Sequence, residues 1–241
     1  MTPTHPTSVL VTGASGGVAQ ALLARLAAAN VPTLAASRSA AQGLFQADTT
    51  TPEGAKAAVA ACVAQHGSLG GVAHCVGSTL IAPLSRTSAE QYREVIRVNL
   101  DSAFYMLQAT VEAAKAQGKP CSIVLVSSVV AGIGVANHEA IAAAKGAIEA
   151  LTRSAAATYA ATGIRVNCVA PGMTDTPMTA NILKSEAMRA GAEKQYPING
   201  VNSADDVAAA IAWLLSADAA RVTGQLIHVD GGFTHIRPLV K

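Results

Sequence analysis

The sequence predicts an α/β fold in which helices cover both faces of a doubly wound parallel sheet. Short apolar runs alternate with longer helical patterns along almost the whole chain, an order typical of such sheets. Hydrophobic residues make up 51% of the 241 residues and charged residues 13%, which excludes a disordered chain. No linker interrupts the alternation, so we expect a single domain over residues 1–241.

The apolar runs are the predicted strands. Each is short and mostly apolar, and turn-forming or polar residues bound it. They are residues 8–12, 32–37, 44–47, 71–76, 121–127, 164–169 and 225–229.

The segments with helical periodicity lie between these strands. They are residues 18–29, 53–65, 89–117, 138–161 and 204–215. Residues 38–43, between the second and third strands, are too few for a crossover helix. We therefore expect a loop there, which leaves one face of the sheet partly uncovered.

A glycine-rich turn follows the first strand and opens the first helix, at residues 12–18. Gly13 permits the tight turn, and Gly17 lets the backbone approach a pyrophosphate. Near Ser15 and Val18 the helix start offers free N–H groups and a positive dipole end to phosphates. An ordinary glycine turn is the alternative, but the strand–turn–helix context favours a Rossmann-type dinucleotide-binding domain.

The end of the second strand predicts which dinucleotide is preferred. An acidic residue there would bind a ribose 2′-hydroxyl, and none is present. Arg38 follows the strand instead and can pair with the 2′-phosphate of NADP. A solvated loop arginine is the alternative, so we expect NADP as the preferred cofactor with NAD possible.

The chain resembles the short-chain dehydrogenase/reductase family from residue 9 to residue 232. That family has a Tyr-x-x-x-Lys signature with a serine and an asparagine upstream. Lys145 matches the lysine, Ser128 the serine 13 residues before position 141 (141 − 128), and Asn99 the asparagine. The tyrosine position holds Ile141. The resemblance implies an NAD(P)(H)-dependent oxidoreductase acting on a small carbonyl or alcohol.

Two segments of the resemblance lie near the adenosine and the ribose. Asp48 and Thr49 resemble the family's adenine-contacting pair, although Asp48 could equally cap a helix. Residues 74–77, His-Cys-Val-Gly, stand in place of Asn-Asn-Ala-Gly and keep only Gly77, which lets the backbone pass close to the ribose. The lost asparagines leave the stabilisation of this strand unexplained.

A further segment of the resemblance lies at the nicotinamide. Pro171 and Gly172 begin the family's Pro-Gly loop, in which the backbone of Thr174 and the hydroxyl of Thr176 would hold the carboxamide. A simple turn is the alternative for an isolated Pro-Gly pair. The polar stretch at about residues 177–202 is a predicted lid over the substrate.

Isoleucine at position 141 removes the expected general acid. In the family, the lysine orients the nicotinamide ribose and lowers the pKa of the tyrosine, and Ile141 has no group that can donate a proton. Loss of a general acid typically costs on the order of 10² to 10⁴ in rate. His138, three residues earlier, is a possible substitute acid or merely caps the helix, whereas Tyr196 would have to arrive from the lid.

Two functions of different classes therefore stand. One is an oxidoreductase with altered or weakened proton transfer, in which the proton comes through water or His138. The other is a nucleotide-binding pseudoenzyme with a sensing or structural role. Retention of Asn99, Ser128 and Lys145 favours the enzyme, and Ile141 favours the pseudoenzyme.

Composition narrows the partners and the compartment. A net charge of +2 without a Lys/Arg cluster predicts neither nucleic-acid nor membrane binding, and no targeting segment is recognised at residues 1–7. The four cysteines show no metal-binding spacing, so we expect reduced thiols and no metal. We expect a cytoplasmic protein, and residues 222–232 resemble the family's last strand, which implies a homo-oligomer, either a tetramer or a dimer.

Overall fold

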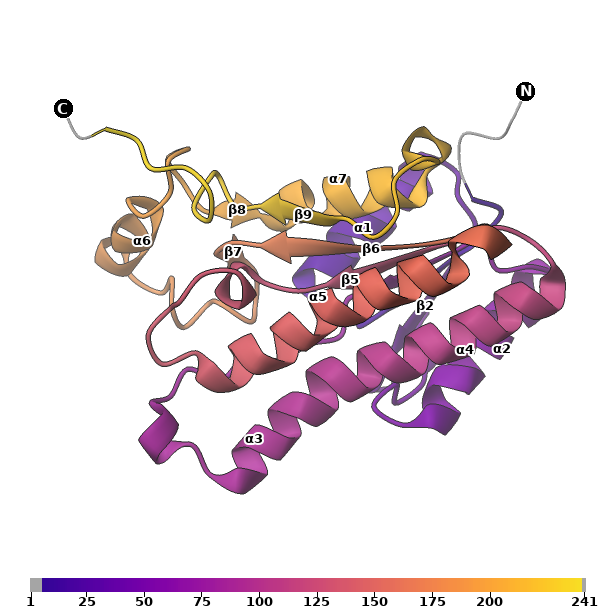
Figure 1. Ribbon diagram of the computed structural model, residues 1–241, viewed down its shortest axis with the longest axis horizontal. Coiled ribbons are helices and arrows are strands. Elements are labelled where there is room, and N and C mark those ends of the chain that lie inside the picture. The colour runs from indigo at the N-terminus through magenta and orange to yellow at the C-terminus, as the bar shows by residue number, and fades with distance from the viewer. Residues whose placement is uncertain (1–5, 240–241) are drawn as a thin grey trace.

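The computed structural model describes residues 6–239, and its centre is one parallel sheet (Figure 1). The strands of this sheet are β1 (Val9–Thr12), β2 (Thr33–Ser37), β3 (Phe45–Gln46), β4 (Gly71–His74), β5 (Cys121–Val126), β6 (Ile164–Pro171) and β9 (Leu226–Val229). They are ordered β3-β2-β1-β4-β5-β6-β9, and every neighbouring pair is parallel. The predicted single-domain α/β fold is confirmed.

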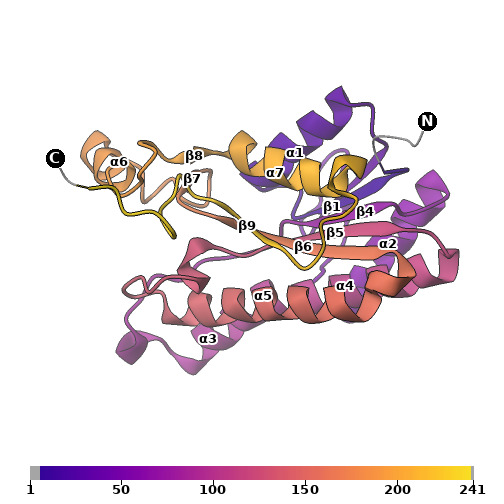
Figure 2. The ribbon, with the colours of Figure 1, turned by 45° about the horizontal axis from the view of Figure 1, so that its top comes forward.

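Helices cover both faces of the sheet (Figure 2). On one face lie α1 (Gly17–Ala28) and α7 (Ala204–Leu215), whose buried residues pack with Val9 and Val11 of β1. On the other face lie α2 (Pro52–His66), α4 (Ser102–Gln117) and α5 (Glu139–Tyr159), which share a core with Leu10. Successive residues of a strand point to opposite faces of the sheet, so a single strand such as β1 contributes side chains to both cores.

The connection between β2 and β3 has no helix, as predicted. The prediction of one uninterrupted helix over residues 89–117 is wrong. The structure has α3 (Ala89–Ile96), a π-helical turn (Arg97–Asp101) and then α4. Within this turn the amide of Asn99 donates to the carbonyl oxygen of Val95 at 2.9 Å, and the Ser102 hydroxyl donates to that of Val98 at 2.6 Å. Side-chain bonds of this kind compete with the α-helical ladder and favour a local widening.

The predicted lid segment contains structure that the sequence pattern did not predict. It holds α6 (Glu186–Glu193), which Ser185 caps by accepting from the Met188 N–H at 3.3 Å. The short strands β7 (Thr174–Asp175) and β8 (Asn202–Ser203) pair in parallel and hold the start and the end of the lid segment together. Short 3₁₀ turns occur at Leu84–Arg86, Val129–Ala131, Ala160–Thr162 and Ala217–Ala219.

No helix within residues 6–239 is both long and apolar enough to cross a membrane. The expectation about a targeting segment at residues 1–7 falls mostly on residues 1–5, which lie outside the described residues.

Candidate active site

The site lies where the strand order reverses, between β1 and β4. In doubly wound sheets the helices on the two sides of this point diverge, so a crevice opens beyond the carboxyl ends of the strands. A cavity of about 450 Å³ occupies this position. Its walls come from the β1–α1 turn, the ends of β4, β5 and β6, the start of α5 and part of residues 176–196.

The glycine turn after β1 is suited to a diphosphate. Gly13 has φ +70, and a Cβ there would lie 2.8 Å from the backbone of Cys75. Helix α1 begins after Gly16 with no side-chain cap and no acidic residue in its first turn. Its first N–H groups therefore remain available to an anion.

Gly17 is constrained by protein as well as by any ligand. It lines the cavity together with Val18, and a Cβ on it would lie 3.0 Å from Cγ2 of Thr176. The prediction that this glycine serves approach to a diphosphate is therefore incomplete, because it also lets the loop after β6 close against α1.

Ser15 and the residues predicted for the adenosine end do not line the cavity. Ser15 lies 3.4 Å from Ser37 at the end of β2, hydroxyl to hydroxyl. Arg38 is exposed in the loop that follows, and Thr49 is buried. The loop that replaces a crossover helix leaves this arginine open to solvent.

Asp48 accepts hydrogen bonds from the backbone N–H and the hydroxyl of Thr50, at 3.0 and 2.7 Å. Burial alone would raise the pKa of its carboxyl, but these bonds and the charges of Arg97 and Arg38 outweigh burial and hold the pKa below its usual value. The alternative prediction that Asp48 caps a helix is wrong, because Thr51 caps α2 by accepting from Gly54 N–H.

Ser128, His138, Ile141 and Lys145 all line the cavity, so the structure brings together the residues predicted around the missing tyrosine. Ser128 directly follows β5, and its hydroxyl oxygen accepts the N–H of the following 3₁₀ turn at 3.4 Å. The Lys145 ammonium donates to the carbonyl oxygen of Val126 at 2.9 Å. Burial lowers the pKa of Lys145 to about 8. An ammonium and a hydroxyl that line the same cavity can polarise a carbonyl group.

Asn99 does not line the cavity. It is fully buried behind it, where its amide donates to the Ser78 hydroxyl at 3.0 Å and its oxygen accepts the Ser78 N–H at 3.2 Å. A Cβ on Gly77 would lie 3.1 Å from Asn99 Oδ1 and 3.3 Å from Lys145 Nζ. The asparagine therefore positions the backbone that passes beside the lysine, which is a supporting role.

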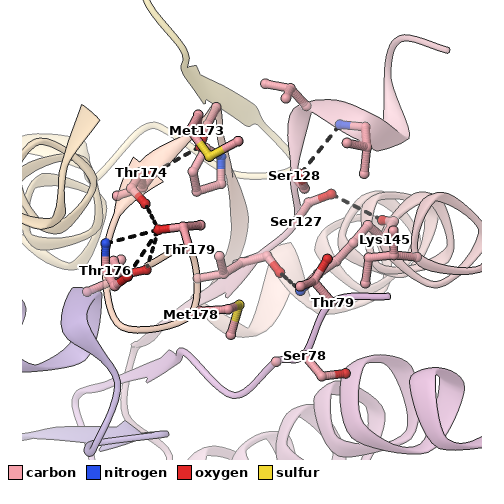
Figure 3. Close-up of a pocket in the computed structure, with 18 of the residues that line it drawn as sticks. Ser78, Thr79, Ser127, Ser128, Lys145, Met173, Thr174, Thr176, Met178 and Thr179 are labelled. Carbon is pink, nitrogen blue, oxygen red and sulfur yellow. Dashed lines mark hydrogen bonds between the residues drawn. The ribbon is translucent and has the colours of Figure 1, made fainter. Parts of the chain in front are cut away.

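The predicted nicotinamide-binding loop is held together by its own hydroxyls. Figure 3 shows Thr174, Thr176 and Thr179 together on the side of the cavity opposite Lys145. The Thr174 hydroxyl donates to the carbonyl oxygen of Gly172 at 2.9 Å, and the Thr176 N–H donates to Thr179 Oγ1 at 3.1 Å. Thr179 was not predicted, because a single threonine after Pro177 gives no periodic signal.

Two further residues have roles in the site region that the sequence did not predict. His74, which replaces an asparagine of the family motif, is buried and joins β1 to α4. Tyr196 lines the cavity, where its phenol oxygen accepts the Met173 N–H at 2.6 Å and its ring lies 5.1 Å from that of Phe233. Burial raises the pKa of Tyr196. Tyr196 does reach the cavity from the predicted lid segment, but it lies beside the loop after β6.

Comparison with known proteins agrees with the fold. The sequence matches the family described as Enoyl-(Acyl carrier protein) reductase over residues 13–234. It is 35% identical to 3beta-hydroxysteroid dehydrogenase 1 of Eggerthella lenta, over 94% of this chain and 93% of that protein.

Solved structures give the same result. A short-chain type dehydrogenase/reductase from Mycobacterium ulcerans superposes with a TM-score of 0.88 at 30% identity, covering 94% of this chain and 89% of that one. The aldohexose dehydrogenase of Thermoplasma acidophilum gives a TM-score of 0.89 at 27% identity, over 97% and 96% of the two chains. The chain therefore belongs to the short-chain dehydrogenase/reductase family of NAD(P)-dependent oxidoreductases.

Proposed function

We propose that this protein is an NADP(H)-preferring oxidoreductase for a small carbonyl or alcohol, and that it works without a tyrosine at position 141. One observation carries the proposal: a single cavity joins the uncapped start of α1 to Ser128 and Lys145. A protein that only bound a nucleotide could use Lys145 for the ribose but would have no use for the Ser128 hydroxyl beside the reactive end of the crevice. When bound, the nicotinamide supplies or accepts the hydride.

Different residues of this chain bind different parts of the cofactor and the substrate. Gly13, Ser15, Gly17 and Val18 hold the diphosphate at the amide end of α1, while Lys145 orients the nicotinamide ribose. Ser128 donates a hydrogen bond to the substrate oxygen. The remaining cofactor contacts are Asp48 and Thr49 at the adenine, Gly77 at the ribose, and Pro171, Gly172, Thr174 and Thr176 at the nicotinamide.

The cavity lining favours an uncharged substrate. Among the described residues that line the cavity, Lys145 is the one Lys, Arg, Asp or Glu. Apolar side chains of the lining include Val129, Val130, Ile141 and Met178. Burial of a charged substrate without a partner would be costly. An apolar ketone or secondary alcohol suits this wall, and the similarity to a hydroxysteroid dehydrogenase supports that class.

Arg38 supports NADP over NAD. It stands exposed directly after β2, where no carboxylate is available for a ribose 2′-hydroxyl. Its guanidinium can form charge-assisted hydrogen bonds to a 2′-phosphate.

We also propose that the protein works in the cytoplasm as a homo-oligomer. Phe104 on α4 is 49% exposed and Trp213 on α7 is 41% exposed, and aromatic side chains of this kind are enriched at subunit interfaces. Light scattering after size-exclusion chromatography measures the oligomeric state, and a monomer at micromolar concentration would contradict the proposed homo-oligomer.

The central experiment compares the parent protein with Ile141→Tyr and with Ile141→Phe, which has the same ring but no hydroxyl. Binding of NADPH is measured first, and its oxidation with a panel of apolar ketones second. We expect the parent to bind NADPH and to turn over slowly, Ile141→Tyr to be faster, and Ile141→Phe to show no gain. An absence of NADPH binding would contradict both the enzyme and the alternative, a nucleotide-binding pseudoenzyme. Binding without turnover in the parent, together with turnover in Ile141→Tyr, would favour the pseudoenzyme.

A further inference from the structure

The start of α5 brings an imidazole to the cavity wall beside the position without a proton donor. His138 is the N-cap residue of α5 and lines the same cavity as Ile141. Ile141 is 3% exposed and packs with Val95 and Ala144, so this part of the wall is aliphatic. We propose that His138 is a catalytic residue that carries the proton to and from the substrate oxygen on its Nε2 atom. This inference rests on the proposed function and names the proton carrier of that site.

The backbone around His138 is held by hydrogen bonds. Asn137 has φ +63, a left-handed conformation that asparagine adopts more readily than most residues. Its carbonyl oxygen accepts the N–H of Ala82 at 2.9 Å, which ties the loop to the segment after β4. The carbonyl oxygen of His138 accepts the N–H of Ala142 at 2.8 Å and begins the helix. The imidazole is therefore attached to backbone that is held on both sides.

The hydrogen bonds of the ring determine which nitrogen can exchange a proton. His138 Nδ1 lies 2.7 Å from the carbonyl oxygen of Ala136. A carbonyl oxygen only accepts, so Nδ1 carries a hydrogen and donates it. The neutral ring then has its lone pair on Nε2, and within residues 6–239 that atom has no hydrogen-bond partner. Orientation of a histidine through one nitrogen leaves the other free for acid–base work.

The other titratable groups of the cavity are less suited to the task. The Lys145 ammonium is committed to the carbonyl oxygen of Val126. The Tyr196 phenol is held against the loop after β6 by the Met173 N–H, rather than against α5. His138 precedes Ile141 by three residues on the element that carries Lys145, so it lies on the side of the cavity where a proton is needed.

The step balances without another reactant. In reduction, the carbonyl carbon gains a hydride from the reduced nicotinamide, and the π electrons of the broken C=O bond move to oxygen. That oxygen takes the proton from Nε2 of the imidazolium, which becomes a neutral imidazole and is reprotonated by water. Oxidation of the alcohol runs in reverse, and Nε2 accepts the hydroxyl proton.

The kinetic test uses His138→Ala in the parent and in Ile141→Tyr, with NADPH affinity and thermal unfolding measured to show that each variant folds. We expect His138→Ala to lower kcat by on the order of 10² to 10⁴ in the parent, with NADPH binding retained. The loss should shrink in the Ile141→Tyr background, because a phenol then shares the role, and added imidazole should restore part of the activity of His138→Ala.

The outcomes separate the two proposals. If the parent turns over and His138→Ala is equally active, or if Tyr196→Phe shows the loss instead, the assignment of His138 is wrong and the enzyme stands. If only Ile141→Tyr turns over, the proposed function fails, and the role of His138 fails with it.

A second measurement does not depend on turnover. Nitrogen NMR of the free protein, with His138→Asn to assign the signals, reports which ring nitrogen of neutral His138 carries the hydrogen. Hydrogen on Nδ1 supports the proposal. Hydrogen on Nε2 in the neutral ring would overturn it.

Discussion

The imidazole of His74 lies 2.9 Å, through Nε2, from the hydroxyl oxygen of Ser102. Because that hydroxyl donates its own hydrogen to Val98, its oxygen accepts from Nε2. Nδ1 then accepts from the Thr12 hydroxyl, 2.8 Å away. Both ring nitrogens are satisfied in the neutral form, and this explains how strand β4 remains tied to its neighbours without the asparagines of the family motif.

The stability of the protein should fall in mild acid because of His74. Burial lowers the pKa of this imidazole from 6.5 to about 3. Between these values the unfolded chain binds a proton that the folded chain does not, so the free energy of unfolding decreases as pH falls. Urea unfolding at several pH values measures this dependence. In His74→Asn, which lacks the imidazole, the decline should be shallower, and parallel curves for the two proteins would contradict the prediction.

His74→Ala tests the hydrogen bonds themselves. It leaves a cavity and removes both partners of buried hydroxyls, so we expect a loss on the order of 2 to 4 kcal/mol at neutral pH. His74→Asn keeps polar atoms and should lose less. Equal stability of the alanine variant and the parent would show that the bridge contributes nothing.

Lys145 should make a stabilising contribution that grows in mild base. Burial lowers the pKa of this ammonium from 10.5 to about 8. As pH rises through about 8 the folded protein releases a proton that the unfolded chain still holds, so the free energy of unfolding increases. Between about pH 7 and pH 9 we expect the free energy of unfolding of the parent to change by on the order of 1 kcal/mol more, in the stabilising direction, than that of Lys145→Met. An equal change in the two proteins, or a more stabilising change in Lys145→Met, would contradict the prediction.

The comparison with Lys145→Met is needed because buried thiols act in the opposite direction. Burial raises the pKa of Cys75, of Cys121 and of Cys168 from 9.0 to about 12. As pH approaches and passes about 9 the unfolded thiols ionise while the folded ones do not, and this lowers stability. The parent and Lys145→Met share these thiols, so the difference between the two proteins isolates the lysine.

The sheet and most helices followed from periodicity because each strand and helix buries one continuous apolar pattern. The π-helical turn at Arg97–Asp101 did not, because it depends on hydrogen bonds from Asn99 and Ser102 to carbonyls one turn earlier. Both residues are ordinary polar positions in a helical pattern. Only their buried three-dimensional surroundings make those bonds favourable.

The site could be predicted where a residue's role follows from its place on a strand or helix end. Ser128, Ile141 and Lys145 line one cavity because β5 and the start of α5 meet there. The contacts of Tyr196 and Thr179 could not be predicted, because they depend on the path of residues 177–202 beside the cavity. That path is determined by tertiary contacts rather than by local pattern.

Gly13→Ala should be far more damaging than Gly43→Ala. Both glycines have positive φ, +70 and +77, so both alanines bear the left-handed strain of about 1 to 2 kcal/mol. At Gly43 a Cβ has open space, whereas at Gly13 it would lie 2.8 Å from the backbone of Cys75 and Val76. We expect Gly13→Ala to lose NADPH binding and several kcal/mol of stability. Similar melting temperatures for the two variants would contradict this.

Arg38 should determine the choice between the two dinucleotides. If its guanidinium pairs with the 2′-phosphate, Arg38→Ala removes a charge-assisted interaction typically worth 1.5 to 3 kcal/mol, which is a loss of about 10- to 100-fold in NADPH affinity. NADH affinity should stay near its parent value, because NADH has no phosphate at that position. Arg153→Ala is the matched control, because it removes the same charge from an exposed residue of α5. Arg153 lies far along α5 from the N-terminal part that lines the cavity. Fluorescence titration of both coenzymes against the three proteins gives the ratio of dissociation constants directly. A ratio in Arg38→Ala equal to that in Arg153→Ala would mean that the arginine is merely solvated, and the selectivity would then have to come from elsewhere along the loop after β2.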